Sequence, residues 1–123
     1  MFDHISIKVA NARTTIDFYL AALEPLGIDR KFEAERPDGV IAGYGRDRVN
    51  FFIGEGTAAT YTPIHIALQA QDRAQVDAFH AAAVAAGGRN NGAPGVRAKY
   101  HDRYYAAYVI DPAGNNLEVV FQG

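Results

Sequence analysis

HISIKVA at residues 4–10 and HIALQAQ at residues 65–71 are two stretches of this chain that read almost as copies of each other. The offset between them is 61 residues, and the same offset relates Phe18 to Phe79 and Gly27 to Gly88. A duplicated unit that cannot bury its apolar face alone must pack against its twin. The repeat therefore predicts two similar modules, with His4 and His65 at equivalent positions.

Each copy opens with an alternating strand that leads into a helix. In the first strand, residues 2–9, the positions from Ile5 to Val9 alternate between an apolar face and the polar face that carries His4. Asn11 then caps a helix through about residue 23, which Pro25 and the glycine at position 27 end. Strands are expected near residues 31–34, 40–44 and 48–53. The first module is thus βαβββ.

The second half repeats this order. A strand over residues 64–69 leads to a helix that Asp72 caps and that ends near residue 86, before two glycines. Further strands fit residues 89–91, 104–110 and 116–121, and the segment Asp111–Gly114 forms a tight turn between the last two. Residues 57–63 serve as a linker. We expect a single α+β domain with βαβββ modules at residues 1–56 and 64–123.

Composition narrows the class of protein. The chain has 123 residues, a formal net charge of −2 and no cysteine. This net charge does not indicate binding to nucleic acid or to a membrane surface. Without cysteine the chain has neither a disulfide framework nor a thiolate site. No apolar run reaches the ~18 residues of a membrane span, and the first residues lack the features of a signal peptide. We therefore expect a cytoplasmic protein whose ligand is a small molecule.

The two histidine strands and the segment DPAGNNLE at residues 111–118 resemble the vicinal oxygen chelate superfamily. It includes glyoxalase I, bleomycin-resistance proteins, fosfomycin-resistance transferases and extradiol dioxygenases. The resemblance covers nearly the whole chain. It implies that the modules pair edge to edge into an open, cup-shaped mixed sheet with the helices on its outer face.

The resemblance also implies a metal site. Its ligands would be His4, His65 and Glu118, and the bound ion a divalent metal such as Zn, Ni, Mn or Fe. Strand alternation agrees, because each of the three lies on the face opposite its strand's apolar residues. Two imidazoles and one carboxylate leave coordination positions open, as catalytic sites do. In close relatives two chains often share the site, so a homodimer is expected, although one chain could also hold all three ligands.

One position departs from the pattern of glyoxalase I. When residues 50–53 are aligned with residues 116–119, Phe52 takes the place of Glu118, so the first module offers no carboxylate. A phenyl ring neither binds a metal nor moves a proton. We therefore expect an activity other than that of glyoxalase I, with Phe52 as an apolar wall against the substrate or as plain core packing.

The stretch from residue 97 to residue 105 is rich in positive charge. If it is extended, Arg97, Lys99, His101 and Arg103 share one face, which suits a carboxylate or phosphate but also fits a solvated edge. His101 is the best candidate for a general acid or base, because the usual pKa of histidine lies near neutrality. Together with Glu118 it forms the predicted catalytic pair. The predicted substrate contacts are Phe52, Arg103, Tyr105 and Tyr108.

Two functions of different classes remain open. The first is a metal-dependent lyase, isomerase or dioxygenase, in which the ion acts as a Lewis acid on a small, oxygen-rich substrate that could be anionic. The second is a metal-free protein of the bleomycin-resistance type, which would bind an aromatic or antibiotic-like molecule between Phe51, Phe52, Tyr104, Tyr105 and Tyr108. The ligand trio favours the enzyme, because a binding protein has no need for it.

Overall fold

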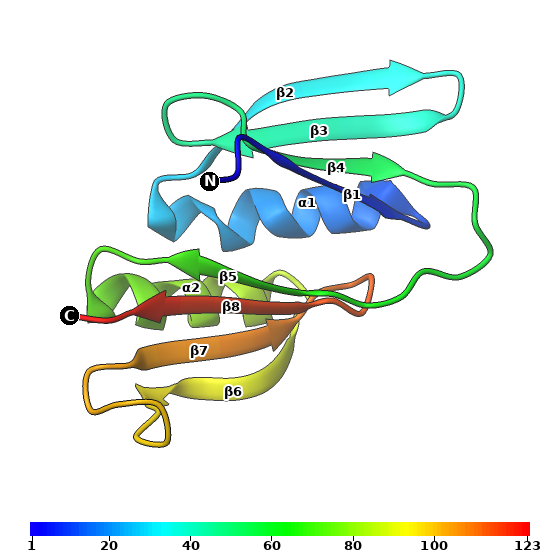
Figure 1. Cartoon of the computed structure of the whole chain (residues 1–123). Helices are drawn as coiled ribbons and strands as arrows, with labels where there is room; N and C mark the ends of the chain where they lie inside the picture. Colours follow the sequence, from blue (N-terminus) through cyan, green and yellow to red (C-terminus); the bar gives the residue numbers. More distant parts are fainter.

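The computed structural model describes all residues, 1–123, and contains the two predicted βαβββ modules (Figure 1). The first module consists of β1 (Ile5–Val9), α1 (Ala12–Ala22), the short 3-10 helix η1 (Glu24–Leu26), β2 (Asp29–Arg36), β3 (Gly39–Gly45) and β4 (Phe51–Glu55). The second consists of β5 (His65–Gln69), α2 (Arg73–Ala85), β6 (Arg89–Val96), β7 (Tyr105–Ile110) and β8 (Asn116–Phe121). The α+β fold class is confirmed.

Each module forms a mixed sheet of four strands. The orders are β1-β4-β3-β2 and β5-β8-β7-β6, with the first pair of each parallel and the others antiparallel. The strands β1 and β5 are therefore edge strands of separate sheets. No hydrogen bonds link the edges of the two sheets within one chain, and α1 and α2 pack against each other where the modules meet.

The core lies between the sheets and the two helices. It is one cluster of 23 buried residues drawn from both modules, and α1 packs directly against α2. A buried hydrogen bond crosses the junction, where the Tyr19 hydroxyl on α1 donates to Asp111 Oδ2 at 2.6 Å. Asp111 also accepts from the backbone N–H groups of Ala113 and Asn115 in the β7–β8 turn. The turn of one module is thereby tied to the helix of the other.

The helix starts differ between the modules. The Asp72 side chain accepts a hydrogen bond from the Gln75 N–H at 2.8 Å, as predicted for a cap. Asn11 makes no such bond; its backbone is left-handed, with φ of 54°. Asn11 is thus the N-cap residue of α1, as predicted, but it caps the helix without a side-chain hydrogen bond. This asparagine instead provides a conformation that most residues adopt at a cost.

The strands β2 and β6 are longer than the sequence suggested. The β6 strand continues through Gly92, Pro94 and Gly95, which are weak strand formers, and its pairing with β7 shifts register twice. A bulged edge strand accommodates proline because the N–H group that proline lacks is not needed for pairing there. It accommodates glycine because little side-chain packing is lost at such a position.

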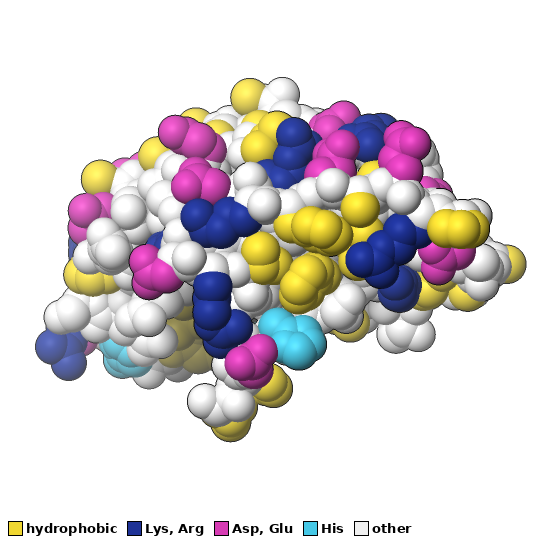
Figure 2. Space-filling model, turned by 90° about the horizontal axis from the view of Figure 1, so that it is seen from above, with side chains coloured by type: hydrophobic (Ala, Val, Ile, Leu, Met, Phe, Trp, Pro, Cys, Tyr) yellow, Lys and Arg dark blue, Asp and Glu magenta, His cyan; other side chains and the backbone are white.

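The surface carries charges of both signs. Seen from above, the face in Figure 2 shows basic and acidic side chains close together, with hydrophobic side chains between them. No helix has the length and apolar character needed to cross a bilayer.

Candidate metal and substrate site

His65, Glu118 and Tyr104 form a hydrogen-bonded group on the second sheet. His65 Nε2 lies 2.8 Å from Glu118 Oε2, and the Tyr104 hydroxyl donates to Glu118 Oε1 at 2.5 Å. His65 is the first residue of β5, and Glu118 lies on β8 next to Ala67 and opposite Tyr108 of β7. Each carboxylate oxygen therefore has its own partner.

The burial of these groups differs sharply. The side chain of Glu118 is 2% exposed, whereas that of His65 is 53% exposed. A carboxylate buried without partners would be very costly, so the two contacts are what allow Glu118 to sit here. Burial, followed by the hydrogen bond to Glu118, raises the pKa of Tyr104, which keeps its hydroxyl protonated and donating. Burial and the charge of Glu118 also raise the pKa of Tyr108.

His4 stands apart from this group. It precedes β1, its side chain is 56% exposed, and its Nδ1 lies 2.7 Å from Asp3 Oδ1. Asp3 also accepts from Arg48, and these two partners lower the pKa of the Asp3 carboxyl. In Figure 1 β1 begins beside the N-terminus at the left, whereas β5 begins at the right. One chain holds no cluster of three metal-capable side chains, so it does not bring the predicted trio together.

Phe52 occupies the position that corresponds to Glu118. It lies beside Ser6 on β1, as Glu118 lies beside Ala67 on β5, so the strand registers support the alignment made from sequence. Its ring meets the His4 ring edge to face, with centroids 5.8 Å apart. The first module therefore presents an imidazole and a phenyl ring where the second presents an imidazole and a carboxylate.

The positively charged stretch at residues 97–105 divides into two parts. His101 Nε2 lies 2.9 Å from Gln122 Oε1, and its ring contacts Tyr104, which bonds Glu118. Arg103 donates its backbone N–H to His101 Nδ1 but lines none of the main cavities. Arg97 and Lys99 line a cavity beside His65. Arg97, Lys99, His101 and Arg103 therefore do not form a single face.

Two predicted aromatic contacts lie on the helix side of their sheets. The Tyr105 hydroxyl donates to Asp77 on α2 at 2.6 Å, and Phe51 is buried against Tyr19 and Tyr44. Neighbouring residues on a strand point to opposite faces, so Tyr104 and Tyr108 lie with Glu118 while Tyr105 does not. The structure thus separates Tyr105 and Phe51 from the candidate site. Tyr104, foreseen only as an aromatic wall, is the contact that the sequence reasoning missed.

A cavity of about 550 Å³ opens beside His65. It is lined by Tyr108, Asn116, Asn91, Gly92, Arg97, Lys99 and Tyr100 as well as His65. This volume is that of a small-molecule site. The predicted contact Tyr108 is part of its wall, with its ring centroid 6.4 Å from that of His65.

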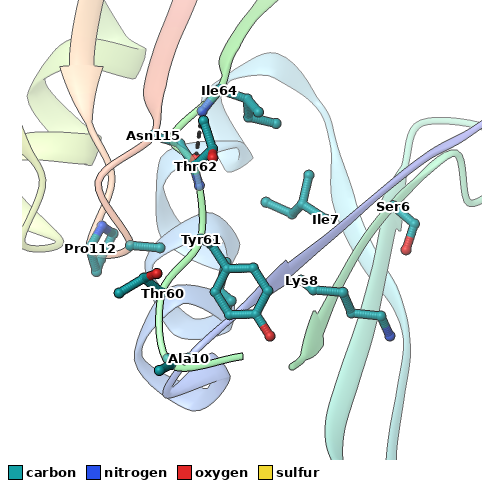
Figure 3. A pocket seen from close by; sticks show the side chains of 13 residues that line it. Ser6, Ile7, Lys8, Ala10, Thr60, Tyr61, Thr62, Ile64, Pro112 and Asn115 are labelled. Atoms are coloured by element: carbon teal, nitrogen blue, oxygen red, sulfur yellow. Dashed lines mark hydrogen bonds between the residues drawn. The ribbon is translucent and has the colours of Figure 1, made fainter. Parts of the chain in front are cut away.

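A second cavity, of about 720 Å³, lies between β1 and the linker (Figure 3). Figure 3 shows the Tyr61 ring projecting from the linker toward Lys8, and the dashed line is the hydrogen bond from the Ile64 N–H to Asn115 Oδ1. The lining contains none of the three predicted metal ligands. We therefore place the candidate site at the His65 cavity.

A family model described as the glyoxalase/bleomycin resistance protein/dioxygenase superfamily matches residues 1–119. The chain belongs to this superfamily. No curated protein sequence matches the chain.

Solved structures of superfamily members resemble the whole chain. A glyoxalase/bleomycin resistance protein from Albidiferax ferrireducens has 28% identity and a TM-score of 0.80, over 98% of both chains. A mutant of glyoxalase I from Zea mays matches 97% of this chain with 46% of its own, at 21% identity and a TM-score of 0.72. The fosfomycin resistance protein FosX of Listeria monocytogenes, in complex with Mn(II), matches 98% of this chain with 87% of its own, at 19% identity and a TM-score of 0.68.

Proposed function

We propose that this protein is a metal-dependent enzyme whose site is completed by a second copy of the chain. His65 and Glu118 of one subunit and His4 of the other would bind one divalent ion. The observation that carries the proposal is the His65–Glu118 pair, a buried carboxylate held beside an exposed imidazole.

The donor set fits a divalent metal. Ligand atoms bound at roughly 2.0–2.2 Å to one ion lie about 3 Å apart when they subtend a right angle. The separation of 2.8 Å between His65 Nε2 and Glu118 Oε2 is close to this value. The mixed nitrogen and oxygen set suits zinc, nickel, manganese or iron and leaves coordination positions open for substrate oxygens.

A homodimer would explain the position of His4. The strands β1 and β5 have unpaired edges, and such edges are templates for association with another chain. A two-fold arrangement that sets the start of β1 beside the start of β5 of a second chain would unite the equivalent histidines. Most soluble homo-oligomers have this symmetry, and it would create two sites per dimer.

The remaining roles follow from the contacts of Glu118. A bound ion would supply Lewis acidity toward a carbonyl or hydroxyl oxygen of the substrate. Tyr104 holds one oxygen of Glu118 and limits its rotation. His101, in contact with Tyr104, is the proposed proton carrier, and Phe52 would form an apolar wall. Because Phe52 replaces a carboxylate, we expect no turnover of methylglyoxal with glutathione.

The direct test is metal content. Protein purified without an affinity tag should hold one divalent ion per chain by elemental analysis, and His4→Ala, His65→Ala and Glu118→Ala should each abolish binding. His80→Ala is the matched control, because His80 bonds Asn90 on the other side of the sheet. Circular dichroism would verify the fold of each variant. Unchanged metal content in all three ligand variants would refute the proposal.

The alternative is metal-free binding of an aromatic molecule. Its support is the aromatic wall near Glu118, where the rings of Tyr100 and Tyr104 lie with centroids 4.7 Å apart. The same measurement separates the two functions, because a sequestration protein should purify without metal and bind its ligand equally well after Glu118→Ala.

A further inference from the structure

We propose that Arg97 and Lys99 form a binding site for an anionic oxygen group, a carboxylate or a phosphate, beside His65. This inference rests on the proposed function, because the anion site would bind one end of the substrate of the proposed enzyme. That substrate would be anionic at one end and rich in metal-binding oxygens at the other. The binding site itself stands on separate observations.

The first observation is that neither cation is neutralised. Salt bridges elsewhere occupy Arg13, Arg30, Lys31 and Arg48, but neither Arg97 nor Lys99 has an acidic partner. Both side chains line the same cavity of about 550 Å³. Two unpaired cations in one concave space create a local positive field, although the chain as a whole has a net charge of −2.

The second observation is that Arg97 is held in place. Its Nη2 donates to the Ala93 carbonyl at 2.7 Å, and its guanidinium carbon lies 5.3 Å from the centroid of the Tyr108 ring. These contacts leave other N–H donors of the guanidinium without a partner in the chain. An arginine that is oriented in advance binds a planar or tetrahedral oxyanion at a lower entropic cost.

The third observation is the space that β6 provides for this arginine. A Cβ added at Gly92 would lie 3.1 Å from Arg97 Nη2, and one added at Gly95 would lie 3.2 Å from Nη1. The two glycines thus let the guanidinium lie close against the strand. The register shifts of β6 occur around these same residues. The Arg97 guanidinium therefore packs against the irregular part of the strand.

Tyr108 joins this anion site to the candidate metal site. Its ring lies between the two, in contact with Arg97 and 6.4 Å between centroids from His65. Asn91 and Asn116, which bond each other, line the same wall and add amide groups for polar oxygens. A small molecule could therefore place one oxygen group on Arg97 and Lys99 and extend others past Tyr108 toward His65 and Glu118.

The test is an NMR titration of the full chain, treated with chelator, at constant ionic strength set with sodium chloride. Inorganic phosphate and acetate are the two probes, and the backbone amides of residues 91–100 are observed. We expect saturable shifts there, weakened about tenfold or more by Arg97→Gln, weakened also by Lys99→Gln, and unchanged by Arg89→Gln, an exposed charge on the same strand outside the cavity. The tighter probe identifies the anion class.

The outcomes separate this inference from the proposed function. Phosphate or acetate binding that depends on Arg97 supports the anion site even if no metal is ever bound. No saturable shift with either probe, or equal affinity in wild type and Arg97→Gln, overturns the anion site even if metal binds to His65 and Glu118.

Discussion

The two modules share a topology and differ in what they present on the face away from the helices. In both, a histidine lies at the start of the first strand, and the residue two positions further, Ser6 or Ala67, pairs with Phe52 or Glu118 on the last strand. The second module thus has a hydrogen-bonded half-site, and the first has an exposed imidazole against a phenyl ring. Duplication preserved the packing faces, while the outer faces acquired different chemistry.

The same contrast holds on the helix side. Tyr19 is completely buried and bonds Asp111 across the module junction, whereas its repeat equivalent His80 is partly exposed and bonds Asn90 within its own module. The Tyr19 side chain therefore links the two modules, whereas the His80 side chain bonds only within its own module.

The largest effect expected from this asymmetry is on stability. Tyr19→Ala should lower the free energy of unfolding by about 3–5 kcal/mol, because it empties a large buried site. Tyr19→Phe should cost about 1–3 kcal/mol, since Asp111 loses a donor. His80→Ala should change stability by less than about 0.5 kcal/mol. Urea denaturation measures all three, and equal losses at the two positions would show that the modules are not asymmetric in this way.

A smaller effect concerns the outer face of the second module. Tyr104→Phe removes the hydrogen bond to Glu118 Oε1, and the affinity for a divalent ion should fall about 10-fold to 100-fold, as for other partners that orient a metal ligand. Tyr100→Phe is the matched control, because no hydrogen bond of the Tyr100 hydroxyl to Glu118 exists. Isothermal titration with Zn²⁺ gives the affinities. Equal Zn²⁺ affinities for wild type and Tyr104→Phe would show that Tyr104 does not orient the metal ligand Glu118.

The smallest effect should appear at the helix starts. Asp72→Ala should destabilise the protein by about 1 kcal/mol, through loss of the bond to the Gln75 N–H. Asn11→Gly should leave stability unchanged or raise it by up to about 1 kcal/mol, because glycine adopts the left-handed backbone without strain. Thermal unfolding of both variants decides this point. A loss at Asn11→Gly as large as at Asp72→Ala would mean that the asparagine side chain has a role of its own.

Much of the fold could be predicted from the sequence because repeat and alternation are local properties. The alternation in β8 placed Leu117 and Val119 in the core and Glu118 on the opposite face, and the structure agrees. The placement of the modules could not be predicted in this way. Alternation shows which face of a strand is buried, but it does not show which edge of a sheet meets which neighbour.

The candidate site was predictable to the same extent. The repeat indicates His65, and the resemblance carried by residues 111–118 indicates Glu118. Tyr105, predicted as a substrate contact, bonds Asp77 on the helix side instead, and Ala106 and Ala107 give no contrast that would distinguish the two faces of β7. The contact of Tyr104 could have been found by extending the register from the Asp111–Gly114 turn. That register sets Tyr108 opposite Glu118 and places Tyr104 on the same face.

Subunit complementation tests the shared site most directly. A heterodimer of His4→Ala and Glu118→Ala chains, isolated with two different tags, contains one site in which all three ligands are intact. We predict one divalent ion per heterodimer, although each variant alone binds none. A heterodimer without metal, despite proven subunit exchange, or a monomeric wild-type chain that binds one ion, would contradict a site formed by His4 of one chain and His65 with Glu118 of the other.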